Sequence, residues 1–375
     1  MNPFRAMMIL WIVGGGSSAG GAEGDLMEGR VNPSALCGDC HQEIFTMWKR
    51  SMHSAAFTDP VFQSSYLQAY MDTGGEAKKI CLRCHAPAAD LTGDFDMKEE
   101  TSQEGIACDF CHSIVSVDLN RPERPFEVKF DGVKRGPLGD AESPVHDVAQ
   151  SNLHQSAEFC AGCHEYVNEF GVPILSTYSE WRLSPQAAEG KNCQACHMPM
   201  IPGETVREDF EIQRGSINLH NISGGHSTEQ VRKAATARIL SVRREKPTVG
   251  VVSVEVANIG SGHSIPTGLP TRKLILEVIL YADGHEVRRF ERKYQKTLLD
   301  KQNRLLTKDH RVMLDAWKLL EDNRLRAGER RVERLVARVP TDGKLEAEIH
   351  LRYFYEPEIL SRQKISIEMA TDHSP

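Results

Sequence analysis

The chain carries five copies of the motif Cys-x-x-Cys-His, and this repetition constrains its fold more than any other feature of the sequence. The motifs use all ten cysteines of the 375-residue chain, so no thiol remains for a disulfide. In each copy two thiols are separated by about one helical turn and a histidine follows at once. The copies are Cys37-Gly-Asp-Cys40-His41, Cys81-Leu-Arg-Cys84-His85, Cys108-Asp-Phe-Cys111-His112, Cys160-Ala-Gly-Cys163-His164 and Cys193-Gln-Ala-Cys196-His197.

This motif is the attachment site of haem c, because its thiols reach the two vinyl groups of one porphyrin and its imidazole reaches the iron. A single copy would also suit a zinc site or a redox dithiol. Five copies in one chain favour haem. We therefore predict five covalently bound haem c groups, attached through the ten motif cysteines. The predicted iron ligands within the motifs are His41, His85, His112, His164 and His197.

Residues 23–240 hold all five motifs, which leaves about 44 residues for each haem. Long apolar periodicities are scarce in this region, and glycine, proline, serine and charged residues are frequent, as in 131–144. The porphyrin faces must then supply much of the apolar core. We expect a mainly helical and irregular, haem-packed domain that is largely unfolded without haem.

Ten histidines outside the motifs are candidates for the second axial position of the irons. Four are expected elsewhere, at a hairpin, on the polar face of a strand, in a charged run and in the C-terminal tail. These four are His285, His350, His310 and His373. Methionine is the other possible axial ligand and would raise the reduction potential of a haem. Six histidines remain for the five axial positions, which favours two histidine ligands on each iron and low reduction potentials. The six are His53, His146, His154, His220, His226 and His263.

Local sequence distinguishes these candidates. His53 ends a predicted helix from Gln42 and lies twelve residues after His41, a rise of about 18 Å that directs it to a neighbouring haem; a surface position is the alternative. His263 lies in a proline-bounded loop, where it would tether the second domain to the haems or stabilise a turn. The preceding Ser143-Pro144 favours His146 over His154. The predicted distal ligands are His53, His146, His220, His226 and His263, and glycines between His220 and His226 allow close approach to a porphyrin.

Residues 241–375 show a different pattern, with period-two alternation and apolar runs separated by Gly, Pro and Asp turns. This pattern predicts an antiparallel β-sandwich domain, so the expected fold class is α + β multidomain. The formal charge is +5 from residue 241 onward and −12 before it, which indicates attraction between the two domains. The predicted strand segments are Val252–Val256, Leu274–Leu280, Val332–Val339 and Leu345–Tyr355.

The first 22 residues have the layout of a secretory signal peptide, with Arg5, an apolar run and small residues up to Ala22. An uncleaved membrane anchor is the alternative, although the apolar run is short for a span. We therefore expect a protein that is exported to the periplasm, the extracellular space or the cell surface.

The segment from Cys37 to His53, with Trp48 and Ser51 before the histidine, resembles the opening of the cytochrome c554-type multihaem cytochromes. Segments 104–112, 158–164 and 192–199 are similar to later haem sites of that group, and 258–268 looks like the start of a β-sandwich appended to some exported multihaem proteins. The resemblance implies closely packed, mostly bis-His haems that conduct electrons. It also implies kinship with hydroxylamine oxidoreductase and the ammonia-forming nitrite reductase, but no motif here ends in Lys, which lowers the expectation of nitrite reduction.

Three functions follow from these observations. The first is single-electron transfer between a membrane-linked donor, such as a quinol-linked complex or another cytochrome, and a periplasmic or surface acceptor. The second is reduction or oxidation of a small nitrogen or sulfur compound at one open haem. The third is a homo-oligomer or haem polymer within a surface or outer-membrane complex. We expect an electron-transfer protein before a substrate-converting enzyme, and the acidic net charge of −7 argues against nucleic acid as a partner.

Overall fold

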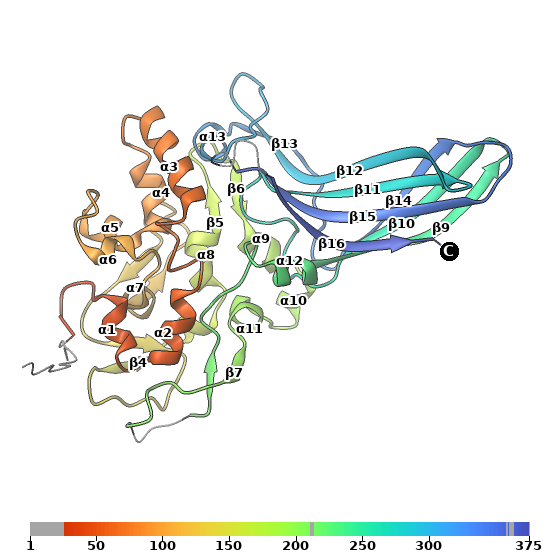
Figure 1. Ribbon diagram of the computed structural model, residues 1–375. Helices are drawn as coiled ribbons and strands as arrows, with labels where there is room; N and C mark the ends of the chain where they lie inside the picture. Colours follow the sequence, from red (N-terminus) through yellow and green to blue (C-terminus); the bar gives the residue numbers. More distant parts are fainter. Residues whose placement is uncertain (1–25, 211–213, 358, 360–363, 375) are drawn as a thin grey trace, which may run out of the picture.

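The computed structural model describes residues 26–210, 214–357, 359 and 364–374. The predicted signal peptide lies outside these residues. Figure 1 shows an N-terminal part built of short helices and loops, and a C-terminal part of long strands that extends away from it. The α + β architecture expected from the sequence is confirmed. Within the described residues, no helix is both long and apolar enough to cross a membrane.

The N-terminal part has short helices because its sequence is interrupted by Gly and Pro and by the motifs themselves. The longest helix is α3 (Pro60–Asp72), which begins with Pro60 at its first turn and is capped by the Asp59 carboxylate, which accepts from the Phe62 amide at 3.0 Å. The other helices are α1 (Ser34–Gly38), α2 (Gln42–Lys49), α4 (Lys78–His85), α5 (Pro87–Thr92), α6 (Glu100–Gln103), α7 (Cys108–His112), α8 (Glu158–His164), α9 (Thr177–Arg182), α10 (Pro185–Ala188) and α11 (Cys193–His197).

Four of the five motifs end a helix: α4, α7, α8 and α11 each finish at the motif histidine. Between the helices lie two-stranded sheets, of which the β3–β4 pair is parallel and the others antiparallel. The pairs are β1 (Ile114–Val117) with β2 (Phe126–Val128), β3 (Lys134–Gly136) with β4 (Val148–Gln150), β5 (Glu165–Val167) with β6 (Pro173–Ser176), and β7 (Met200–Pro202) with β8 (Ser216–Asn218); η1 spans Asn152–Gln155.

The C-terminal part consists of a three-stranded and a five-stranded antiparallel sheet. Their facing side chains form one apolar core in which Val252, Leu276, Leu335 and Ile349 are fully or almost fully buried. The first sheet has the order β14 (Arg330–Arg338), β10 (Val249–Asn258), β9 (Ala235–Lys246). The second has the order β13 (Lys318–Asp322), β12 (His285–Leu299), β11 (Lys273–Ala282), β15 (Leu345–Tyr355), β16 (Ile365–His373).

The four predicted strand segments coincide with parts of β10, β11, β14 and β15, except that Val339 lies one residue beyond the end of β14. Strand β9 begins at Ala235, ahead of the boundary expected at residue 241, and follows α12 (Thr228–Ala234) directly. The helix predicted from Gln42 to His53 ends at Lys49, so that part of the prediction was wrong. Asp283 and Gly284 both have positive φ, as the hairpin before His285 requires.

The two parts meet along an apolar contact. Ile174 of β6 packs with Leu298 of β12 and with Val312 of α13 (Asp309–Asp315). Helix α13 also lies against α3 of the N-terminal part, as Figure 1 shows at the upper end of the interface. The sandwich is thus fixed against the region that carries the motifs.

Candidate haem-binding site

All ten motif cysteines and all five motif histidines line one continuous cavity of about 2930 Å³. The cavity also reaches the six histidines considered as distal ligands. Protein interiors normally contain few voids larger than a water molecule, so a cavity of this size, lined by thiols and imidazoles, fits several bulky groups attached to those thiols. No two of the ten motif cysteines form a disulfide.

The motif histidines are oriented by backbone carbonyls. When Nδ1–H donates to a carbonyl, the tautomer is fixed and Nε2 is left as the metal ligand. Four of the five motif histidines have this arrangement. The Nδ1···O distances are 2.6 Å for His41 to Thr205, 2.8 Å for His85 to Ala56, 2.6 Å for His112 to Arg135 and 2.8 Å for His197 to Ser223.

Three motif histidines face one of the predicted distal histidines across the cavity. Two imidazoles bound to opposite sides of one metal ion, each at about 2 Å, have ring centres roughly 6 Å apart. The observed separations of ring centres are 6.3 Å for His41 and His146, 6.2 Å for His164 and His53, and 6.4 Å for His197 and His263. These three pairs therefore have the spacing that an iron between two imidazoles needs.

Local contacts place two of these distal rings. His53 lies in the turn after α2, and the Ile106 amide donates to the His53 carbonyl at 2.8 Å. Gly105, with a φ of +67°, approaches the same carbonyl so closely that a side chain at position 105 would clash with it. The Trp48 indole donates to the Ile106 carbonyl at 2.8 Å and joins α2 to this turn. His146 follows a turn in which the Ser143 hydroxyl accepts from the His146 amide at 3.3 Å.

His112 has two neighbours that compete for its distal position. The ring of His154 lies 5.6 Å from that of His112, but its Nε2 is 3.2 Å from the carbonyl oxygen of Cys111, inside the same motif. The Nδ1 of His154 is buried without a hydrogen-bond partner. His220 instead has Nδ1 at 2.6 Å from the Asn218 carbonyl, which leaves Nε2 available, and it lies near enough to help lower the pKa of His112. His154 thus has the ring contact with His112, whereas His220 has the available Nε2.

His85 differs from the other motif histidines. Its ring stacks on Phe62, with 3.8 Å between centres and 9° between planes, and makes no ring contact with another histidine in the described structure. His226 lines the same cavity and lies in the neighbourhood of Asp59, whose charge also acts on His85. His226 is therefore placed near this motif without facing it.

Burial keeps the candidate ligands neutral. It lowers the pKa of His53 and of His263 to about 4, and the pKa of His164 to about 3, with neighbouring imidazoles adding to the effect. A histidine binds metal only in its neutral form. These imidazoles are thus in the protonation state of a ligand at neutral pH.

Thiols of different motifs lie side by side, which indicates the order of the motifs in space. A hydrogen bond between Cys37 and Cys108 raises the pKa of the Cys37 thiol, and a hydrogen bond between Cys160 and Cys193 raises that of Cys160. A hydrogen bond with Cys163 likewise lowers the pKa of Cys84. The first motif thus adjoins the third, and the fourth adjoins both the second and the fifth.

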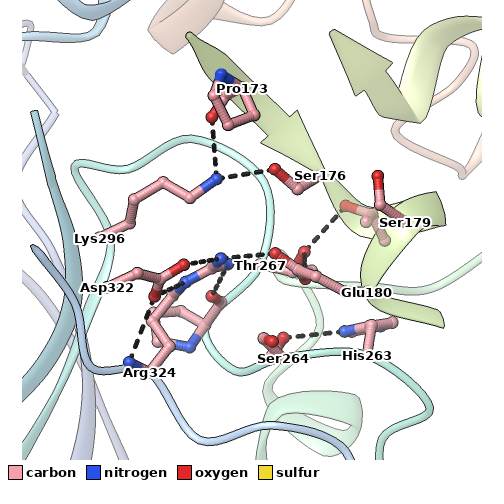
Figure 2. A network of polar contacts seen from close by, with 12 residues as sticks. Pro173, Ser176, Ser179, Glu180, His263, Ser264, Thr267, Lys296, Asp322 and Arg324 are labelled. Atoms are coloured by element: carbon pink, nitrogen blue, oxygen red, sulfur yellow. Dashed lines mark hydrogen bonds and ion pairs between the residues drawn. The ribbon is translucent and has the colours of Figure 1, made fainter. Parts of the chain in front are cut away.

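The loop that carries His263 is anchored by a buried network of charges (Figure 2). Arg324 donates to the Pro266 carbonyl at 3.0 Å and pairs with Glu180 of α9 at 2.5 Å and with Asp322 at 2.7 Å. Thr267 donates to Glu180 at 3.0 Å. The network therefore joins the His263 loop and the end of β13 to the N-terminal part.

A second buried cation completes this contact. Lys296 of β12 donates to the Pro173 carbonyl at 3.0 Å and to the Ser176 hydroxyl at 2.8 Å (Figure 2). Burial lowers the pKa of Lys296 to about 8. Sequence reasoning missed Glu180, Lys296 and Arg324, because they are distant in the chain and belong to no motif.

The histidines expected outside the site differ among themselves. His285 is exposed, as expected. His350 lies between two glutamates, with Glu348 at 2.9 Å and Glu368 at 2.5 Å. His310, expected in a charged run, is only 6% exposed, lines the cavity and lies 3.5 Å from the Asp72 carboxylate. The run Lys308–Arg311 forms the start of α13, which turns His310 inward.

The chain resembles known proteins in one segment of its sequence and in its fold. Residues 36–113, which include the first three motifs, match the family model of cytochrome c554 and c-prime. The fold is similar to that of a penta-heme cytochrome c552 from Thermochromatium tepidum, with a TM-score of 0.72 and 22% identity over 92% of this chain and 99% of that one. A β-glucosidase from Kluyveromyces marxianus gives a TM-score of only 0.17 at 11% identity, over 37% of this chain and 13% of its own. No curated protein sequence matches the chain.

These findings confirm the resemblance to multihaem c-type cytochromes that the motifs predicted. They support covalently bound haem c as the cofactor and electron transfer as the general activity.

Proposed function

We propose that the protein transfers single electrons through five haem c groups, most of them with two histidine ligands. The observation that carries this proposal is the set of three facing imidazole pairs, at ring separations from 6.2 to 6.4 Å. Haem iron with two imidazole ligands has no open position for a substrate and exchanges one electron at low potential. The pairs are His41 with His146, His164 with His53, and His197 with His263.

The remaining motif histidines complete the ligand set. His220 is proposed as the partner of His112, because its Nε2 is available while that of His154 faces the Cys111 carbonyl. His226 is proposed as the partner of His85, since it lines the cavity beside that motif. The residues that hold the five groups are then the ten motif cysteines and ten histidines.

The polypeptide contributes orientation and insulation. Carbonyls that accept from Nδ1 fix the imidazoles and raise their basicity, which favours the oxidised iron and a low potential. Burial excludes water and competing ligands from the cavity. The neighbouring thiols support an electron path in which the first motif adjoins the third and the fourth adjoins the second and the fifth. Cys111, whose charge helps to raise the pKa of Cys163, links the third motif to the fourth.

We further propose that the protein is exported and works in the periplasm or at the cell surface, between a membrane-linked donor and an external acceptor. The N-terminal sequence supports export. We include in this proposal that the protein binds redox partner proteins, that it self-associates, and that it belongs to an outer-membrane complex.

An anaerobic reductive titration of the holoprotein tests the function. Electron transfer predicts uptake of five electrons per chain and their complete return to an added oxidised cytochrome, with no consumption of nitrite or hydroxylamine. Steady consumption of either compound would replace this proposal with an enzymatic one.

One observation favours that second candidate, a reductase or oxidase of a small nitrogen or sulfur compound. His85 faces no imidazole within ring contact among the described residues, and Phe62 stacks on its ring. If His226 does not bind the iron on His85, that iron has an open position. The titration above separates the two functions.

A further inference from the structure

The guanidinium of Arg272, immediately before β11, lacks a charged partner. It lines the cavity, its Nε is buried without a hydrogen-bond partner, and it forms no ion pair with the described residues. The ring of Tyr355 lies 5.4 Å from the guanidinium carbon and fixes its position by a cation–π contact. Arg272 is only partly buried, and a guanidinium that borders a cavity without an ion pair is available to an anion there.

A second donor converges on the same place. A methyl group built on Gly225 would lie 3.4 Å from Arg272 Nη1 and 3.4 Å from the hydroxyl oxygen of Tyr353. Tyr353 is 6% exposed, and its hydroxyl has no hydrogen bond with the described residues. The two donors therefore border one small space beside the Gly225 backbone, next to His226.

A carboxylate in the same neighbourhood, that of Asp309, is already engaged. Asp309 accepts from the Tyr355 hydroxyl and, at 2.5 Å, from the Thr271 hydroxyl. Its two oxygens thus accept from hydroxyl groups, and it forms no ion pair with Arg272 in the described structure. The space at Gly225 is bordered by donors and by one full positive charge.

We propose that Arg272 and Tyr353 bind an oxyanion, either a carboxylate or a small inorganic oxyanion, on the sandwich side of the cavity beside His226. Guanidinium and hydroxyl donors together match two oxygens of such a group. Two sources have this chemistry: a propionate of the haem at the second motif, which rests on the proposed function, and a free anion such as nitrite or sulfite.

Two matched pairs of variants of the holoprotein test the site. Gly225→Ala fills the space, whereas Gly224→Ala adds a methyl group that meets nothing within 4 Å. Arg272→Gln removes the charge at the site, and Arg288→Gln removes an exposed charge elsewhere on the sandwich. Haem content and circular dichroism establish that each variant is folded and loaded.

The measurements are calorimetric titration with sodium nitrite or sodium sulfite under oxidised conditions, and a potentiometric titration followed by haem absorbance. A free anion predicts saturable binding that weakens at least tenfold in Arg272→Gln and Gly225→Ala but not in their controls. A propionate predicts no binding of added anion, and a lower midpoint potential for one haem in Arg272→Gln, because a compensating positive charge is lost.

The proposal is overturned if folded Arg272→Gln differs from Arg288→Gln in neither measurement. The number of haems per chain separates this failure from a failure of the proposed function. Fewer than five haems would contradict the proposed electron path, but the anion titration would still test the site at Arg272. Both measurements use the intact holoprotein.

Discussion

The imidazole rings of His197 and His263 lie 6.4 Å apart and within 10° of parallel, although one ends a motif helix and the other lies in a loop of the sandwich. The loop follows β10, and the Asn258 side chain at the end of that strand donates to the His263 carbonyl at 2.8 Å. The sandwich therefore reaches into the cavity and presents an imidazole to the fifth motif. A docking role alone would not require this contact.

Replacement of His263 tests this relationship. His263→Ala should convert one haem in five from low to high spin and raise its potential, because one of two imidazole ligands is lost. Electron paramagnetic resonance and potentiometry measure both effects. His285→Ala, in an exposed hairpin, is the control and should change neither. A spectrum of His263→Ala identical to that of the control would contradict the assignment.

The charge network behind His263 should contribute to stability. In Glu180→Gln the buried Arg324 loses a carboxylate at 2.5 Å while its side chain is only 5% exposed. Breaking a buried ion pair typically lowers the free energy of unfolding by about 3–5 kcal/mol. Because Asp322 still pairs with Arg324, we expect a loss at the low end of this range, about 3 kcal/mol. Urea denaturation of the holoprotein measures this loss.

The pair Arg238–Glu255 provides the comparison, because Arg238 is 63% exposed and Glu255 keeps Arg330 as a second partner when Arg238 is replaced. Arg238→Gln removes a surface ion pair of 3.0 Å, and such pairs contribute roughly 0–1 kcal/mol. Equal losses in Glu180→Gln and Arg238→Gln would show that the buried network is not a stabilising contact between the two parts.

Lys296 predicts a pH dependence of stability. Burial lowers its pKa to about 8 in the folded protein, whereas an unfolded lysine keeps a pKa of about 10.4. Between these values the unfolded state binds more protons, so stability should rise with pH, by at most about 1.4 kcal/mol per pH unit. Denaturation at pH 8 and pH 10 measures the slope. Lys296→Met should reduce the slope of stability against pH. An unchanged slope would mean that other groups cause the pH dependence.

Haem attachment should be required for only one part of the fold. The motif region has short helices around a cavity of about 2930 Å³, while the sandwich has an apolar core of its own. Replacement of all ten motif cysteines by serine should therefore abolish the helical circular dichroism signal and retain a strand signal. Hydrogen exchange should show protection in β10 and β15 and none in α4 or α8. Native-like helix content in this variant would refute the requirement for haem.

The motifs and the main sandwich strands could be predicted because each is a local pattern. The residues of Cys-x-x-Cys-His are contiguous. Val252–Val256 alternates between apolar and polar residues, Leu274–Leu280 is a mostly apolar run, and both lie in largely buried strands. Strand β12 was not among the predicted segments, because its exposed half is charged and its apolar residues gather near Leu298 and Leu299.

Long-range partners could not be predicted in this way. The sequence favoured His146 over His154, but the reason, a turn at Ser143, does not specify the facing ring of His41. The stacking of Phe62 on His85 and the pairing of Glu180 with Arg324 join residues from separate segments. Nothing in the local sequence indicates such contacts, because they arise only when the chain packs around the cavity.

The most direct test of the central claim is electron paramagnetic resonance of the oxidised holoprotein, with haem counted as the pyridine haemochrome. We expect five haems per chain, all low-spin, and unchanged spectra after addition of nitrite, hydroxylamine or cyanide. Fewer than five haems, or a high-spin signal that responds to one of these compounds, would contradict the central claim.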